Sequence, residues 1–168
     1  MASDHISRNL EPGGWLELQE YVMPVNSKDG THKNTNILKW GQLLCEASRN
    51  LGRPMGSDVC DLFPQQMRDA GFVDVQQRDF AWPTNTWPKN PLMKELGLRT
   101  LINCTDGMEG FCLALLTRGL GWTKEEVDVF VALVKKDFKD RSIHAYIPMP
   151  VIYGRKPFSA WDYDGLAR

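Results

Sequence analysis

Three side chains in this sequence have types suited to general acid–base chemistry: a carboxylate at Glu20, an imidazole at His144 and a phenol at Tyr146. A histidine beside a carboxylate is an effective proton carrier, because the pKa of an imidazole lies near neutrality. We therefore predict these three as catalytic residues. Structural alternatives stay open for each of them: a solvated strand end or ion pair for Glu20, a strand cap for His144, and a core or wall position for Tyr146.

Five further residues are candidates for binding a flat, apolar ligand: Tyr21, Met23, Trp82, Trp87 and Met108. Indole and phenol rings pack well against conjugated molecules. The same residue types also fill protein cores, and methionine adapts to irregular gaps there. Trp87 lies in a proline-rich stretch and is the member expected to be most exposed.

The cysteine pattern predicts free thiols and no metal site. Cys45, Cys60, Cys104 and Cys112 contain no CxxC pair. Cys104 and Cys112 are eight residues apart, which suits buried positions on a helical segment better than a zinc site.

Length and charge indicate one folded domain, residues 1–168, with a core of its own. The 20 basic and 21 acidic residues are mixed along the chain. Without a basic stripe, nucleic acid is not an expected partner. No apolar run reaches the length of a membrane span, and the first residues lack the apolar core of a signal peptide. We therefore expect no membrane partner and a cytoplasmic location.

Periodicity and turn residues predict alternating strands and helices. The expected strands cover residues 15–22, 72–82 and 144–153. The expected helices cover residues 36–51 with Asn36 as cap, 57–70, 91–103, 105–120 with Asp106 as cap, and a last helix opened by a Thr123–Glu126 capping box. The tail at 158–168 either docks on the body or frays.

Several short motifs occur in an order typical of one protein family. They are Pro12-Gly13-Gly14-Trp15, Leu51-Gly52-Arg53-Pro54, Ala70-Gly71-Phe72, His144-Ala145-Tyr146 and Tyr153-Gly154-Arg155-Lys156-Pro157. Over residues 7–157 the chain resembles fungal secondary-metabolite methyltransferases of the class I group, which use S-adenosylmethionine (SAM). The resemblance implies an α/β fold: a truncated, Rossmann-like sheet that keeps strands five, seven and six, with the antiparallel strand seven in the centre. A helical lid at about 88–140 would cover it.

The resemblance also implies what is missing. The glycine-rich loop and the acidic residue that hold SAM in the family have no counterpart in this sequence. We therefore expect no cofactor, unless a partner chain supplies the missing half. The strand from Trp15 to Val22 would lose its usual neighbour, and bare strand edges are normally covered. A homodimer or heteromer that covers this edge is expected.

In the family's sheet, ligands bind at the carboxyl ends of the parallel strands. The resemblance therefore implies that Glu20, Tyr21 and Met23 meet His144, Tyr146 and the 82–87 loop in one pocket. Three functions follow. The first is that of a methyltransferase-derived protein of natural-product biosynthesis that no longer methylates. It would bind a hydrophobic polyketide-like molecule and promote its cyclisation or isomerisation, including pericyclic steps, without a cofactor. The second is a SAM-dependent methyltransferase subunit completed by a partner chain. The third is a non-catalytic adaptor that docks through its sheet edge.

Overall fold

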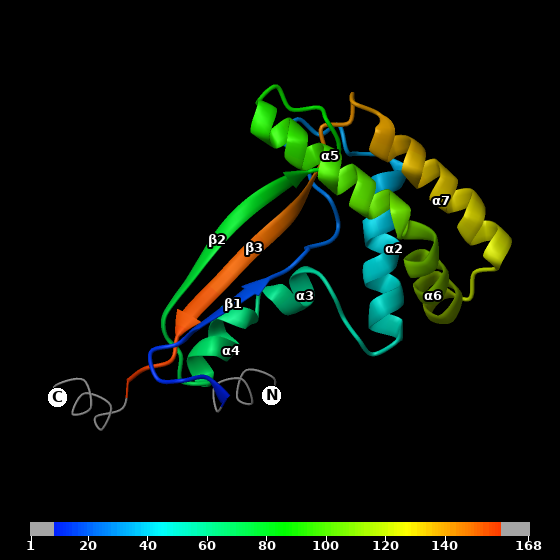
Figure 1. The fold of residues 1–168 in the computed structure, drawn as a ribbon. Coiled ribbons are helices and arrows are strands. Elements are labelled where there is room, and N and C mark those ends of the chain that lie inside the picture. The colour runs from blue at the N-terminus through cyan, green and yellow to red at the C-terminus, as the bar shows by residue number, and fades with distance from the viewer. Residues whose placement is uncertain (1–8, 159–168) are drawn as a thin grey trace.

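The computed structural model describes residues 9–158, so the predicted tail at 158–168 lies outside the described residues except for Phe158. A small sheet lies on one side of the fold and a group of helices on the other (Figure 1). In chain order the elements are β1 (Trp15–Gln19), α2 (Asn36–Asn50), α3 (Ser57–Cys60), α4 (Phe63–Asp69), β2 (Val73–Pro83), α5 (Pro91–Asp106), α6 (Met108–Leu120), α7 (Lys124–Lys139) and β3 (Tyr146–Arg155).

The sheet has three strands in the order β1-β3-β2, and both pairs are antiparallel. Ile152 of β3 lies opposite Leu18 of β1 and Gln77 of β2, so the last strand of the three in the sequence is the central one. This confirms the predicted α/β fold with its five-seven-six strand order.

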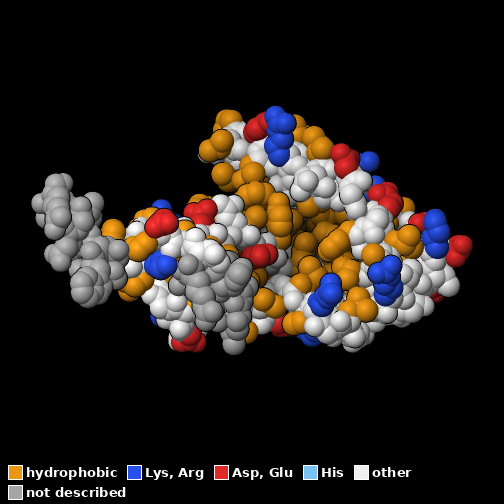
Figure 2. Space-filling view, turned by 60° about the horizontal axis from the view of Figure 1, so that its bottom comes forward, with side chains coloured by type: hydrophobic (Ala, Val, Ile, Leu, Met, Phe, Trp, Pro, Cys, Tyr) orange, Lys and Arg blue, Asp and Glu red, His pale blue; other side chains and the backbone are white. Residues whose placement is uncertain are grey.

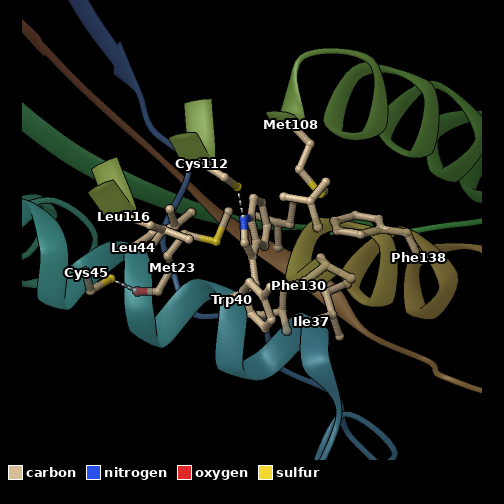
Figure 3. Packing of buried hydrophobic residues seen from close by; sticks show 14 of the residues in the cluster. Met23, Ile37, Trp40, Leu44, Cys45, Met108, Cys112, Leu116, Phe130 and Phe138 are labelled. Atoms are coloured by element: carbon tan, nitrogen blue, oxygen red, sulfur yellow. Dashed lines mark hydrogen bonds between the residues drawn. The ribbon is translucent and has the colours of Figure 1, made fainter. Parts of the chain in front are cut away.

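Trp40 lies in the main core, which α2, α6 and α7 share (Figure 3). The α2 residues Ile37, Trp40 and Leu44 are buried and follow one another at spacings of three and four, so they share one helix face. The Trp40 indole N–H donates to Sγ of Cys112 at 3.1 Å, and its ring meets Phe138 edge-on at 5.6 Å. A smaller cluster of Met67, Phe72 and Ile152 packs α4 on the sheet.

Two predicted helix caps are wrong, and one is right. Thr35 rather than Asn36 caps α2, because the Thr35 hydroxyl accepts the Leu38 N–H at 3.3 Å. Asp106 is the last residue of α5, and α6 begins after Gly107 without a side-chain cap. The capping box of α7 is present: the Thr123 N–H donates to the Glu126 carboxylate at 2.8 Å, and the Glu126 N–H donates back to the Thr123 hydroxyl.

The helix predicted at 57–70 is two short helices, α3 and α4. Pro64 lies in the first turn of α4. A proline there has the backbone angle of a helix start and no N–H that needs a partner. Pro64 therefore favours the start of a second helix, whereas the periodicity had suggested one continuous helix.

Prolines also explain why β1 is shorter than the predicted 15–22. The backbone N–H groups of Glu20 and Val22 still donate to the carbonyls of Pro150 and Pro148, at 3.3 and 3.0 Å. A proline cannot return such a bond, because it has no N–H. Beyond Gln19, hydrogen bonds therefore run only from this segment to β3 and not back, and β1 ends at Gln19.

One long edge of β1 has no strand beside it within residues 9–158, since β1 pairs only with β3. Trp15 on this strand is 54% exposed. A second subunit covering the Trp15–Val22 edge stays a prediction.

Candidate functional site

A cavity of about 590 Å³ lies between the sheet and the helices. Figure 2 shows a hollow there whose visible side chains are mostly hydrophobic. Four of the predicted site residues line the cavity: Glu20, Tyr21, Met23 and Met108. Helices α5 and α6 form one wall through Asn103, Cys104, Met108 and Phe111. A lid function of these helices stays a prediction.

The polar groups of this larger cavity are few. Among residues 9–158, Glu20 is the only carboxylate in its lining, and Tyr21 and Asn103 add a phenol and an amide. Burial and the nearby Cys104 raise the pKa of the Tyr21 phenol, although a hydrogen bond with Asn103 opposes the shift. Trp82 does not line the cavity. Its ring meets the Tyr21 ring edge-on, with the two ring centroids 5.5 Å apart. An apolar cavity with a small number of polar groups is the usual form of a small-molecule site.

Two thiols that line the same cavity have raised pKa values. Burial raises the pKa of Cys60 and of Cys104 to about 11, and the charges of Glu20 and Asp61 add to the effect at Cys60. The nucleophilic form of cysteine is the thiolate, which both residues lack near neutral pH. All four cysteines are free, and Cys104 is half-buried while the other three are buried.

A glycine allows the 53–56 loop to close against the Met23 segment. Gly56 has a φ of +76°, and a Cβ at this position would lie 2.7 Å from the Met23 carbonyl oxygen. Only glycine adopts this backbone conformation at so close an approach without strain. The thiol of Cys45 also contacts that carbonyl, at 3.6 Å. These contacts fix the position of the Met23 side of the cavity.

A separate cavity of about 310 Å³ contains the other predicted catalytic residues, His144 and Tyr146, and also Trp87. His144 Nδ1 is 2.5 Å from a carboxylate oxygen of Asp29, and the backbone N–H of His144 donates to the Thr31 hydroxyl at 2.8 Å. The Thr31 hydroxyl in turn donates to Asp29 at 2.8 Å. The rings of Trp87 and His144 lie 5.2 Å apart.

Hydrogen bonds to Asp29 hold the pKa of its carboxyl well below its usual range. The backbone N–H of Thr31 has the largest effect, followed by the side chains of His144 and Thr31. Asp29 is therefore ionised at neutral pH and faces His144 as a carboxylate.

The single pocket implied by the family resemblance is not formed, because the two halves lie on opposite faces of the sheet. Ile147 of β3 lines the larger cavity, and its neighbour Tyr146 lines the smaller one. Successive side chains of a strand point to opposite faces. Glu20 and His144 line different cavities and do not form an acid–base pair. The catalytic role of each residue stays a prediction.

Sequence reasoning did not identify Asp29 or Thr31 as a site residue. The Asp29-Gly30-Thr31 turn was recognisable, since aspartate favours turns that bond its side chain two residues on. Its contact with His144 spans 115 residues and has no local signal.

The described residues do not form a site that fits SAM. All strand pairs among them are antiparallel, whereas the family's donor loop follows a parallel strand. The nearest glycine pair, Gly107 and Gly110, lies at the junction of α5 and α6 and within α6, with no strand before it. The larger cavity is lined by no lysine or arginine that could pair with the carboxylate of SAM.

Residues 9–158 contain neither a metal-binding cluster nor a membrane-spanning helix. No group of three or more potential ligands there could hold a metal ion. No helix in this part of the chain is both long and apolar enough to cross a membrane.

Curated proteins similar to this chain are fungal. The chain is 42% identical to the probable methyltransferase tdiE of Emericella nidulans over 89% of this chain and 47% of that protein. It is 36% identical to the methyltransferase pytC of Aspergillus terreus, over 89% of this chain and 46% of that protein. It is 32% identical to the secondary metabolism regulator LAE1 of Cochliobolus heterostrophus, over 90% of this chain and 50% of that protein.

The chain thus spans about half the length of the curated relatives it matches. No protein-family model matches it. Among solved structures, a phosphoethanolamine N-methyltransferase 2 of Haemonchus contortus is similar over 92% of this chain and 29% of that chain. Its TM-score is 0.38 and its sequence identity is 15%, too low to bear on fold or function.

Proposed function

Since the chain is homologous to fungal secondary-metabolism methyltransferases over about half of their length, we propose that it provides the substrate-binding part of such a methyltransferase-derived protein. The larger cavity would bind a hydrophobic, polyketide-like small molecule. The observation that carries this proposal is the cavity itself: about 590 Å³, lined mainly by apolar side chains and by a single carboxylate.

The cavity wall supports a flat, apolar ligand. Tyr21, Trp40 and Phe111 contribute aromatic rings, and Met23 and Met108 contribute flexible thioether chains. Apolar burial stabilises a bound ligand by about 25 cal/mol per Å² of surface removed from water, before the cost of association. The few polar groups would then fix the ligand's orientation.

The first candidate reaction is methyl transfer completed by residues outside this chain. It is favoured by the methyltransferase names of two of the relatives described above. The described residues do not fit SAM, so the donor site would have to come from another polypeptide or chain segment. Within such an assembly this chain would bind and orient the acceptor molecule.

The second candidate reaction is cofactor-free isomerisation or cyclisation, favoured by the position of Glu20 in an otherwise apolar cavity. The Glu20 carboxylate would take a proton from an activated C–H of the ligand and return it at another carbon, with no net change in composition. Tyr21 is a phenol on the same cavity wall and is protonated at neutral pH, as an ordinary tyrosine is; burial raises its pKa further. It could therefore donate a hydrogen bond to the enolate oxygen.

Calorimetric titration of the protein, first with SAM and then with an uncharged apolar probe such as N-phenyl-1-naphthylamine, tests the proposal. We expect probe binding and no SAM binding by the chain alone. Val59→Trp should weaken probe binding, because Val59 lines the cavity and an indole there would occupy part of the space. Leu92→Trp is the matched control, since Leu92 is 71% exposed on α5 and does not line this cavity.

Equal probe binding by the wild type and Val59→Trp would rule out the larger cavity as the ligand site. SAM binding by the chain alone would instead mean that the described residues do form a donor site. Methyl-transfer assays and assays for proton exchange at Glu20, with Glu20→Gln as comparison, would then separate the two candidate reactions.

A further inference from the structure

The smaller cavity is built from residues that the proposed function does not use. It measures about 310 Å³ and shares no lining residue with the larger cavity. Its wall combines the paired Asp29 and His144 with Lys28, the aromatic rings of Trp87 and Tyr146, and apolar side chains that include Met93. Polar groups that converge on an apolar, concave surface are the usual mark of a ligand site.

The hydrogen bonds of Asp29 determine which nitrogen of His144 carries the proton. An ionised carboxylate only accepts hydrogen bonds, so the Nδ1 atom of His144 must donate to it. In the neutral imidazole, the other nitrogen, Nε2, then has a free lone pair and acts as an acceptor. Within residues 9–158, no group hydrogen bonds to Nε2.

The Trp87 indole is fixed in place before any ligand binds. Its ring N–H donates to the Ala145 carbonyl at 2.9 Å, and its backbone N–H donates to the Asn85 side chain at 2.9 Å. Asn85 is buried and donates to the Asp140 carbonyl. Because the N–H groups of Trp87 are satisfied, its ring surface is what remains for a ligand. A wall fixed in this way loses little entropy on binding.

We propose that the smaller cavity binds a planar aromatic molecule with a phenolic hydroxyl group, which donates a hydrogen bond to Nε2 of His144 while its ring packs on Trp87. A volume of about 310 Å³ suits a ligand of one or two rings. Lys28 on the same wall favours a phenol over an aliphatic alcohol, because a phenolic oxygen bears more negative charge as it donates. This site is independent of the proposed function of the larger cavity.

Two indole N–H signals allow NMR titration to report on the two cavities separately. Trp87 lines the smaller cavity and Trp40 the larger one. The probes are 2-naphthol, which has a hydroxyl donor, and 2-methoxynaphthalene, which has the same rings and no donor. We expect 2-naphthol to shift the Trp87 signal to saturation, with an affinity about tenfold higher than that of 2-methoxynaphthalene at the same signal.

His144→Asn tests the hydrogen bond, because asparagine keeps a side-chain N–H for Asp29 and has no acceptor at the Nε2 position. It should weaken 2-naphthol binding about tenfold and change 2-methoxynaphthalene binding less than about twofold. Met93→Trp tests the cavity and leaves the Asp29–His144 pair unchanged. This substitution should abolish binding of both 2-naphthol and 2-methoxynaphthalene at the Trp87 signal. Leu92→Trp is its matched control, since Leu92 is 71% exposed on the same helix and does not line the cavity.

Three results would overturn the proposal: shifts of Trp40 without shifts of Trp87, equal affinities for the two probes, or an unchanged 2-naphthol affinity in His144→Asn. The first result would leave the larger cavity, and hence the proposed function, unaffected.

Discussion

Asp137, near the end of α7, accepts hydrogen bonds from the backbone N–H groups of Asn36 and, at 3.2 Å, Ile37, so a residue 101 positions away caps the first turn of α2. The first backbone N–H groups of a helix have no partner within it, and an acceptor there is stabilising. Thr35 supplies a second acceptor, to Leu38. The start of α2 is therefore capped jointly by a local and a distant side chain.

We predict that Asp137→Ala lowers the free energy of unfolding by about 1–2 kcal/mol, because it leaves two half-buried N–H groups without acceptors. Urea denaturation followed by circular dichroism measures the change. Asp128→Ala is the control on the same helix, since the carboxylate of Asp128 is exposed and pairs only with Lys124. Equal losses in the two variants would contradict a special role for Asp137.

Gly97 marks the point where α5 packs directly on the chain after β2. A Cβ at this position would lie 2.0 Å from the backbone oxygen of Asn85. We predict that Gly97→Ala costs about 2–3 kcal/mol of stability, since backbone must move to admit the methyl group. Gly110→Ala provides the opposite case, because Gly110 lies within α6 and its Cβ would meet nothing within 4 Å.

For Gly110→Ala we expect stabilisation by about 0.5–1 kcal/mol, because alanine favours the helix over the unfolded chain. Thermal unfolding of both variants measures the contrast. If both substitutions destabilised the protein to the same degree, the close contact of Gly97 with Asn85 would not be the cause of the loss in Gly97→Ala.

The Asp29 carboxyl should contribute to acid sensitivity. Its pKa is lower in the folded chain than its ordinary value of 3.8, because Thr31 and His144 bond to its ionised form. Such a group stabilises the fold above its ordinary pKa, and this contribution is lost as the pH falls toward the folded-state value. Between about pH 4.5 and pH 2, Asp29→Asn should therefore lose less stability than the wild type. Parallel acid dependence of both proteins, in unfolding midpoints measured across this range, would contradict the prediction.

The thiols of Cys60 and Cys104 should react slowly. With a pKa of about 11, only about one in a thousand of each is a thiolate at pH 8. Alkylation by iodoacetamide should therefore be about a hundred times slower in the folded protein than in urea. Mass spectrometry of the labelled peptides identifies each site, and rapid labelling of either residue would contradict its burial. Both residues line the larger cavity, so a ligand bound there should slow the reaction further.

Local chemistry predicted part of the fold, such as the capping box at Thr123, which depends on residues three apart. The strand order was predicted from the resemblance to a known family, which rested on motifs such as Pro12-Gly13-Gly14-Trp15. Helix boundaries failed where a competing local signal was overlooked, as at Thr35 and Pro64.

The candidate site was harder to predict, because it depends on contacts distant in the sequence. Tyr146 was placed at the correct end of its strand. The position of a residue at a strand end does not tell on which face of the sheet its side chain lies. Tyr146 lines the smaller cavity, whereas its neighbour Ile147 lines the larger one. The Asp29–His144 pair joins a turn to a segment 115 residues later, so no pattern within either segment reveals it.

The central place of β3 in the sheet has a consequence for synthesis of the chain on the ribosome. β1 and β2 pair with β3 and not with each other, and β3 is the last of the three to be translated. At about 5–20 residues per second, the ribosome would need roughly 7 to 28 seconds to make the chain between the start of β1 and the end of β3. Until β3 is made, β1 and, once it is translated, β2 lack a ladder partner, so the newly made chain depends on its helices, or on chaperones, to keep them from pairing with other chains.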